Sequence, residues 1–312
     1  MEKRKVILVG TGFVGTSFAY SLLNQGGVNE LILIDVNTEK AQGEALDLAH
    51  GVAYAPSKMD IRFGDYTECK DANIVVITAG INQKPGQTRL ELVETNAKIT
   101  KSVVEQVMEN GFKGIFIVAS NPVDIMTYVV QKTSGMPTSR VIGSGTMLDT
   151  ARLRYLLGED LEISPKNTHA YVMGEHGDSS FVPWNHCYIG CKRLLDIAEA
   201  QGKTLQDLEK IRDDVKNAAY EIIEKKKATY YGIGVALTRL VKAVLNDEEA
   251  ILTVSTFLNG EYNEKDIYIG VPAIITNKGI REILELPLNE NEQQKLSNSS
   301  DVIRGIIKEL DI

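Results

Sequence analysis

A glycine-rich segment near the amino terminus constrains the fold of this chain more than any other feature. Gly10-Thr-Gly-Phe-Val-Gly15 directly follows the apolar run Val6-Ile-Leu-Val9 and opens a helical stretch at about 13–25. In that setting the first glycine allows a tight turn, the second lets a pyrophosphate approach the backbone, and the third lets helix and strand pack closely. The segment therefore predicts a strand, a phosphate-binding turn and a helix that begin a dinucleotide-binding unit.

The first half of the chain alternates short β-branched runs with amphipathic stretches. The runs show little polar alternation, as expected of parallel strands that helices cover on both faces. The predicted strands are 6–9, 31–34, 74–77, 115–118 and 140–142. The predicted helices lie at about 13–25, 38–50, 89–110 and 123–134. This order predicts an α/β fold with a Rossmann-type, doubly wound parallel sheet.

The second half of the chain has a different pattern and predicts an α+β domain. Long charged helices and short strands replace the regular alternation, and no low-complexity linker separates the two halves. The predicted elements are helices at about 204–227 and 232–245, strands at about 251–257 and 267–275, and a polar helix from about 290. We place the boundary near 145, with a dinucleotide-binding domain over 1–145 and a substrate domain over 146–312.

Composition and charge disfavour several classes of protein. The 312 residues are 43% hydrophobic and 24% charged, which is ordinary for a globular protein with one or two domains. The net charge of −8 disfavours a nucleic-acid partner. No apolar run approaches the roughly 20 residues of a membrane span, and the first apolar run is too short for a signal peptide. We therefore expect a cytoplasmic protein with neither a nucleic-acid nor a membrane partner.

The cysteines point neither to a disulfide framework nor to a metal site. Cys69, Cys187 and Cys191 form an odd, sparse set without a Cys-x-x-Cys pair. His186 lies close to two of them, but no fourth ligand stands at a typical zinc spacing. We expect His186, Cys187 and Cys191 to be packing residues of an apolar strand.

Asp35 ends the second predicted strand, twenty residues after Gly15. At that place a carboxylate can accept hydrogen bonds from a ribose diol, and it repels a 2′-phosphate. Val36 and Asn37, which follow, supply no adjacent cation. The segment therefore favours NAD over NADP. The alternative role for Asp35 is that of a helix N-cap.

Two further segments carry groups suited to acid–base chemistry. Met173-Gly-Glu-His-Gly-Asp178 contains His176, and Leu148-Asp-Thr-Ala-Arg152 places an acid and a guanidinium on one helix face. His176 can exchange a proton, Asp149 can orient its ring, and Arg152 can grip a substrate carboxylate. Taken singly, they could be a loop histidine and an ordinary helical ion pair. Beside a dinucleotide site, they predict a dehydrogenase of hydroxy acids.

The whole chain resembles the lactate/malate dehydrogenase family. The motifs that carry the resemblance are Asn82-Gln-Lys-Pro-Gly-Gln-Thr-Arg89, Ser120-Asn-Pro122, Gly143-Ser-Gly-Thr-Met-Leu-Asp-Thr-Ala-Arg152 and Gly174-Glu-His-Gly-Asp178. The resemblance implies NAD-dependent L-lactate dehydrogenase activity, the reversible conversion of pyruvate and NADH to L-lactate and NAD⁺ at the end of fermentative glycolysis. Two alternatives are a dehydrogenase of malate or another 2-hydroxy acid, and a non-catalytic NAD-binding protein on the same fold.

The resemblance also implies the roles of individual residues. Arg89 would polarise the reacting carbonyl, Asn121 would bond to the substrate oxygen, and Thr229 would lie near the substrate methyl group. The implied catalytic residues are His176, Asp149 and Arg89. The implied substrate-binding residues are Gln83, Arg89, Asn121, Asp149, Arg152 and Thr229. The implied cofactor-binding residues are Gly10, Gly12, Val14, Gly15, Asp35, Lys40, Tyr66, Ala79, Gly80, Ser102, Ala119, Asn121 and Ser144.

Position 83 separates lactate from malate as the expected substrate. Malate enzymes of the family carry an arginine where this chain has Gln83. A second substrate carboxylate needs such a cation, because a buried charge without a partner costs several kcal/mol. A neutral glutamine suits the methyl group of pyruvate instead.

Arg154 and His169 form a candidate effector site. Arg154 stands two residues beyond Arg152, about 200° round a helix, so it points away from the active site. Family members that fructose 1,6-bisphosphate activates are similar at both positions, where an Arg/His pair binds a phosphate across a subunit interface. The resemblance thus implies this activator and a homotetramer, the alternative being that both are plain surface residues.

Overall fold

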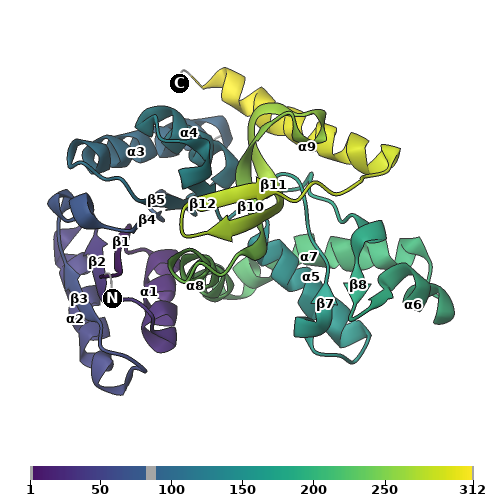
Figure 1. Ribbon diagram of the computed structural model, residues 1–312, viewed down its shortest axis with the longest axis horizontal. Coiled ribbons are helices and arrows are strands. Elements are labelled where there is room, and N and C mark those ends of the chain that lie inside the picture. Colours follow the sequence, from purple (N-terminus) through teal and green to yellow (C-terminus); the bar gives the residue numbers. More distant parts are fainter. Residues whose placement is uncertain (1–2, 82–88, 311–312) are drawn as a thin grey trace.

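One nine-stranded sheet forms the centre of the computed structural model, which describes residues 3–81 and 89–310 (Figure 1). Six of its strands run parallel, in the order β3-β2-β1-β4-β5-β6. Their bounds are β1 Lys5–Val9, β2 Glu30–Ile34, β3 Asp60–Phe63, β4 Ile74–Ile77, β5 Ile115–Val118 and β6 Val141–Gly143. This strand order is that of the Rossmann fold, so the predicted doubly wound sheet is confirmed.

Helices cover both faces of the sheet because the strands are apolar on both faces. In β1, Val6 and Leu8 belong to a core cluster with residues of α1, α2 and α8, whereas Ile7 and Val9 belong to a second cluster with residues of α3, α4 and α9. The helices of the first half are α1 Phe13–Gln25, α2 Thr38–Gly51, α3 Arg89–Glu109 and α4 Val123–Ser134. All four lie where the hydrophobic pattern predicts them.

The second half extends the same sheet and adds a helical layer beside it. Strands β10 Ala250–Asn259, β11 Lys265–Thr276 and β12 Gly279–Ile283 continue the sheet in antiparallel fashion, through the pair Ser255–Gly143. The helices of this half are α5 Met147–Asp160, α6 Leu194–Ala200, α7 Leu205–Lys226, α8 Tyr231–Leu245 and α9 Glu290–Glu309. A separate small sheet contains β7 Thr168–His169, β8 Tyr188–Ile189 and β9 Lys192–Arg193.

Short 3-10 helices connect several of these elements. They are η1 Val52–Tyr54, η2 Tyr66–Asp71, η3 Thr138–Arg140, η4 Pro165–Asn167, η5 Trp184–His186 and η6 Glu261–Asn263. Strands β3 and β12 were not predicted from the sequence. In β3 only Ile61 is buried, so the strand carries too few apolar residues to be recognised.

Cys187 packs in a hydrophobic cluster as expected, but the expectation that His186, Cys187 and Cys191 lie in one apolar strand is wrong. His186 ends η5 and its Nε2 lies 3.0 Å from the Pro287 carbonyl oxygen. Cys187 follows η5 and is buried, whereas Cys191 is exposed in the turn between β8 and β9. Gly190, at φ +58°, turns the chain there, so the apolar run does not continue as one strand.

Within 3–81 and 89–310, no helix combines the length and apolar character that crossing a bilayer requires. In the same residues, no three histidine, cysteine, aspartate or glutamate side chains are grouped so that they could hold a metal ion.

Candidate active site

The carboxyl ends of the parallel strands bring much of the predicted dinucleotide site to one edge of the sheet. Gly10 follows β1, Asp35 follows β2 and Ala79 follows β4, while Ala119 and Ser144 follow β5 and β6. The strand order reverses between β1 and β4, and in open α/β sheets the ligand crevice lies at such a reversal.

The turn between β1 and α1 has the geometry of a phosphate-binding loop. Gly10 adopts φ +101° and donates its N–H to the Ile34 carbonyl at 2.8 Å. A Cβ at Gly15 would stand 2.1 Å from the Gly10 carbonyl oxygen, whereas a Cβ at Gly12 would meet no atom within 4 Å. Gly12 caps α1 without a side chain, so open space lies at a helix end that offers free N–H groups. This space fits the pyrophosphate of a dinucleotide.

Asp35 is held as an ionised acceptor beside this turn. One carboxylate oxygen accepts hydrogen bonds from Thr11 N at 2.6 Å and Thr11 Oγ1 at 2.9 Å, and the other accepts from Asn37 N at 2.9 Å. Burial alone would raise the pKa of Asp35, but these hydrogen bonds lower it below the usual value. The residue that caps α2 is Asn37, which accepts from Lys40 N, so the N-cap alternative for Asp35 is wrong. The Lys40 ammonium donates to the Thr11 carbonyl at 2.5 Å.

The other predicted cofactor residues occupy varied environments. Val14 lies in the first turn of α1, and Tyr66 begins η2, where burial raises the pKa of its phenol to about 12. Gly80 packs beside the Asn96 side chain, and Ser144 is buried. Ser102 is exposed on α3. No contact in the structure tests these roles, which stay predictions.

His176 and Asp149 form a close ion pair. Nδ1 of His176 lies 2.6 Å from Oδ2 of Asp149, which is buried in the first turn of α5. The attraction of Asp149 outweighs burial and raises the pKa of His176 to about 9. Burial would raise the pKa of Asp149, but the charges of His176 and Arg152 lower it below its usual value. At neutral pH the pair is therefore an imidazolium held by a carboxylate, with Nε2 free of partners among the described residues.

Arg152 lies on the same face of α5 as Asp149. Its Nη1 donates to Oδ1 of Asp149 at 3.1 Å, so the two oxygens of one carboxylate hold a guanidinium and an imidazole. The remaining N–H groups of Arg152 form a fork that suits a substrate carboxylate. The structure thus brings these three predicted side chains together.

Asp124, which the sequence reasoning overlooked, accepts a hydrogen bond from the backbone of His176. It is the second residue of α4 and is buried. Its Oδ2 accepts the backbone N–H of His176 at 2.9 Å, and its Oδ1 accepts Ser255 Oγ at 2.5 Å. Burial raises the pKa of Asp124 to about 6. The signal in the sequence was an acid in the first turn of a helix that follows the Ser120-Asn-Pro122 motif.

Asn121 and Asn96 join the loop after β5 to the loop after β4. The Asn121–Pro122 peptide bond is cis. The side chain of Asn96, buried on α3, donates to the Asn121 carbonyl at 2.9 Å and accepts the Ile81 N–H at 2.9 Å. Asn96 therefore holds Ile81 next to Asn121. An amide on the buried face of a helix was the signal that could have revealed it.

Three predicted substrate residues are not brought into this cluster by any described contact. Gln83 lies outside the described residues, and so does the side chain of Arg89, the first residue of α3. Thr229 is half-buried in the connection between α7 and α8, two helices that pack against α5.

The candidate effector residues lie on the far side of α5. Arg154 Nε donates to the Ala170 carbonyl at 3.1 Å, and the guanidinium stands 5.5 Å from the centre of the Tyr171 ring. His169, next to Ala170, is exposed in β7. Burial lowers the pKa of Arg154. Arg152 and Arg154 thus face different surroundings, and the second contacts the backbone of Ala170, the residue after His169.

These features define a class of enzyme: a dinucleotide-dependent oxidoreductase with a proton-exchanging histidine and an arginine for an acidic substrate. Residues 4–143 match the lactate/malate dehydrogenase NAD binding domain, and residues 146–311 match the lactate/malate dehydrogenase alpha/beta C-terminal domain. The chain therefore belongs to the lactate/malate dehydrogenase family.

Similar proteins carry more specific names. L-lactate dehydrogenase 2 of Bacillus cereus is 54% identical over 301 residues, 96% of each chain. L-lactate dehydrogenase 2 of Lactococcus lactis subsp. lactis is 54% identical over 311 residues, 99% of each chain. Among solved structures, the ligands-bound minor L-lactate dehydrogenase of Enterococcus mundtii is 52% identical with a TM-score of 0.98, and each chain is covered completely. A lactate dehydrogenase from a Medee basin deep-sea metagenome library has the same TM-score and coverage at 51% identity.

Proposed function

We propose that this chain is an NAD-dependent L-lactate dehydrogenase that interconverts pyruvate and NADH with L-lactate and NAD⁺. The observation that carries the proposal is the joint contact of His176 and Arg152 with Asp149, in a chain that also has a glycine turn suited to a dinucleotide. Relatives that share 54% of its residues and bear this name support it.

The residues of the chain supply the proton and the orientation. When bound, the nicotinamide supplies or accepts the hydride at C2 of the substrate. In pyruvate reduction, protonated His176 donates the Nε2 proton to the carbonyl oxygen, which becomes the hydroxyl of lactate. In lactate oxidation the neutral ring takes that proton back. Asp149 stabilises the charged ring, and Arg152 pairs with the substrate carboxylate.

A panel of 2-ketoacids tests the activity. The kcat/KM for NADH oxidation should be highest with pyruvate and lower with oxaloacetate and with longer ketoacids. His176→Ala should lose most of the rate while still binding NADH, because the turn at Gly12 is untouched. Preference for a ketoacid other than pyruvate would overturn the proposal, and so would activity that survives in the His176→Ala protein.

Gln83 is proposed to exclude a second carboxylate. Gln83→Arg should shift the ratio of kcat/KM for oxaloacetate over pyruvate upwards by roughly tenfold or more, because the new cation can pair with the extra carboxylate. Gln87→Arg adds the same charge to the same segment and serves as the matched control. An unchanged ratio in Gln83→Arg, or an equal change in both variants, would contradict this assignment.

We further propose that residues 1–145 hold the coenzyme and that residues 146–312 supply His176, Asp149 and Arg152. The loops that follow β1 to β6 at the carboxyl edge of the sheet carry much of the predicted coenzyme site, which supports this division. Turnover of NADH and pyruvate requires the coenzyme and metabolite pools of the cytoplasm, which is the location we propose.

Arg154 and His169 are proposed to bind a phosphate of fructose 1,6-bisphosphate in a homotetramer. The proximity of Arg154 to Ala170, the neighbour of His169, supports a shared phosphate site. The sugar bisphosphate should lower the KM for pyruvate in the wild type but not in Arg154→Ala. Arg281→Ala, on β12, is the control. An unchanged KM in the wild type would reject the effector, and sedimentation as a species smaller than a tetramer would reject the assembly.

A further inference from the structure

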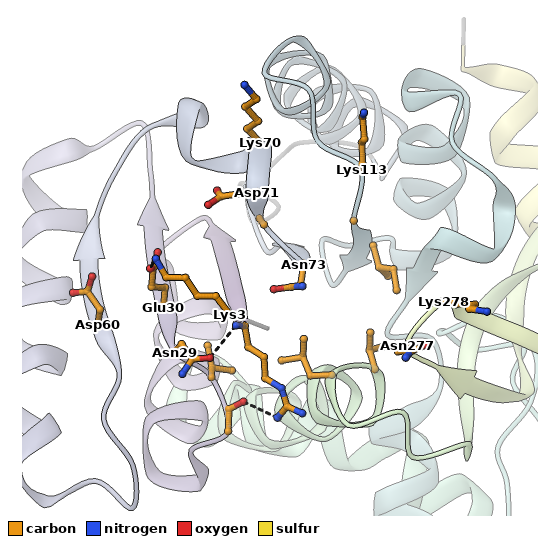
Figure 2. A pocket seen from close by; sticks show the side chains of 18 of the residues that line it. Lys3, Asn29, Glu30, Asp60, Lys70, Asp71, Asn73, Lys113, Asn277 and Lys278 are labelled. Atoms are coloured by element: carbon orange, nitrogen blue, oxygen red, sulfur yellow. Dashed lines mark hydrogen bonds and ion pairs between the residues drawn. The ribbon is translucent and has the colours of Figure 1, made fainter. Parts of the chain in front are cut away.

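A basic cavity of about 1120 Å³ opens at the amino ends of the parallel strands (Figure 2). Arg4 precedes β1, Asn73 precedes β4, Gly114 precedes β5 and Arg140 precedes β6. The end of α8 and the turn between β11 and β12 complete its wall. Because parallel strands have their amino and carboxyl ends at opposite edges, the cavity lies across the sheet from the glycine turn.

The lining of this cavity is positively charged although the protein is acidic. Three acidic side chains line it, Glu30, Asp60 and Asp71. Seven basic side chains line it, Lys3, Arg4, Lys58, Lys70, Lys113, Arg140 and Lys278. The excess of four positive charges contrasts with a net charge of −8 for the whole chain. Such a local excess creates a positive potential in a concave, partly enclosed space.

The acidic side chains of the lining already have cationic partners. The pairs are Glu30 with Lys3, Asp60 with Arg62 and Asp71 with Lys5. Lys5 and Arg62 lie outside the lining and also pair with Glu68, so these two cations are shared among several carboxylates. The positive charges of the cavity are therefore not cancelled by its own acids.

Most of the basic side chains have no acidic partner. Within the described part of the chain, no carboxylate oxygen comes within 4.0 Å of the ammonium groups of Lys58, Lys70, Lys113 and Lys278. Arg4 donates to the Gly27 carbonyl at 3.2 Å and to Asn246 Oδ1 at 2.8 Å. These contacts fix the guanidinium in place and leave part of its fork uncommitted.

The lysines come from separate elements around the rim of the cavity. Lys70 lies in η2, Lys113 precedes β5, and Lys278 lies in the turn after β11 (Figure 2). Positive charges spread over separate elements suit a ligand with several negative charges better than a single small anion. The volume exceeds what one phosphate needs and lies just above the range of about 300–1,000 Å³ that is typical of ligand pockets.

We propose that this cavity binds a compact polyphosphate, either inorganic tripolyphosphate or the phosphate chain of a nucleoside triphosphate. Its negative charges match the excess of positive charge in the lining. A long nucleic acid fits less well, because the rest of the chain carries an excess of twelve negative charges (−8 overall, with four positive charges here). Since the cavity lies at the opposite edge from the coenzyme turn, the ligand does not compete with NADH.

Calorimetric titration of the full chain with sodium tripolyphosphate tests the proposal. The protein carries Arg154→Ala and is saturated with NADH, so that neither the candidate effector site nor the coenzyme site accounts for the heat. Lys70→Glu/Lys113→Glu should weaken binding by roughly tenfold or more, because two attractions become repulsions. Lys265→Glu/Lys308→Glu makes the same change of charge at exposed positions of β11 and α9, and should leave the affinity unchanged.

Both double variants should retain the wild-type kcat for pyruvate, which establishes that they are folded. Affinity for tripolyphosphate should also fall as the salt concentration rises from roughly 50 to 200 mM, because salt screens the attraction between exposed charges. Absence of binding, or equal affinities of the two double variants, would overturn the proposal. Equal binding of citrate would overturn the assignment to polyphosphates.

The same titration with ATP identifies the source of the phosphate chain. An affinity equal to that of tripolyphosphate means that the phosphates alone are recognised. A clearly higher affinity for ATP means that a nucleoside triphosphate is the ligand and that its nucleoside part also contacts the cavity. In either case the bound ligand should raise the melting temperature with its concentration, since it binds only the folded chain.

Discussion

At the scale of residues, two carboxylates rather than one act on His176. Asp149 contacts the ring and contributes most to its raised pKa, while Asp124 accepts the backbone N–H and raises the same pKa from a greater distance. Burial opposes both effects. Asp124 is therefore a positioning residue that also contributes charge, and Ser255 holds its other oxygen.

Asp124→Asn should lower the pKa of His176 while leaving a side chain of the same size. Pyruvate reduction needs the protonated ring, so kcat/KM of the wild type should be constant below the pKa and fall as pH rises through about 9. In Asp124→Asn this fall should occur at lower pH, because an attraction for the proton is gone. The pH profile of kcat/KM with pyruvate measures the shift.

Ser255→Ala is the matched control for this variant. It removes the hydrogen bond between Ser255 and Asp124 but keeps the Asp124 carboxylate. That carboxylate is already ionised at pH 9, because burial raises its pKa only to about 6. Its pH midpoint should equal that of the wild type. Identical midpoints for Asp124→Asn and Ser255→Ala would show that Asp124 only packs.

At the scale of elements, two glycines at the junction of β1 and α1 have different roles, one in ligand binding and the other in packing. Gly12 needs no special backbone, with φ −70°, and has open space where a side chain would stand. Gly15 has no such space, because its Cβ would collide with the Gly10 carbonyl at 2.1 Å. The two glycines therefore serve different purposes in one motif.

Alanine at these two positions should give different results. Gly12→Ala should keep the melting temperature of the wild type but weaken NADH binding roughly tenfold, because the methyl group occupies the approach to the helix end. Gly15→Ala should lower both the melting temperature and the affinity for NADH, because overpacking costs about 1–3 kcal/mol. Fluorescence titration with NADH and thermal melts measure the two effects. A melting temperature equally reduced in Gly12→Ala would contradict the distinction.

At the scale of the whole molecule, the His176–Asp149 pair couples stability to pH. The folded state raises the pKa of His176 from 6.5 to about 9. A raised histidine pKa stabilises the fold fully below about 6.5, and this contribution is lost as pH rises through about 9. The free energy of unfolding should therefore decrease over this window.

Asp149→Asn should reduce the dependence of stability on pH between 6.5 and 9, because the main cause of the raised pKa is removed. Chemical unfolding at several pH values measures it, with Asp47→Asn as a control in an exposed carboxylate on α2. A slope in Asp149→Asn as steep as that of the wild type would show that other groups cause the dependence.

Much of the fold and part of the site were predictable because their signals are local. Apolar runs and glycine spacing specify β1, α1 and the turn between them through nearest-neighbour geometry, and the same holds for the other long parallel strands. Asp149 and Arg152 share a face because a helix places residues three apart together. The roles of Gln83, Arg89 and Thr229 came from family resemblance, since no local rule assigns them.

Only the tertiary structure decided which distant residues meet. Asp124 is separated by 52 residues from His176 and by 131 from Ser255, so no periodicity connects them. The lining of the amino-edge cavity runs from Lys3 to Lys278, and its charge exists only because the strand order brings these loops together. The sequence by itself determined most of the elements, whose hydrogen bonds and apolar faces are set by near neighbours. Contacts between elements depend on how the faces pack, which is a property of the whole chain.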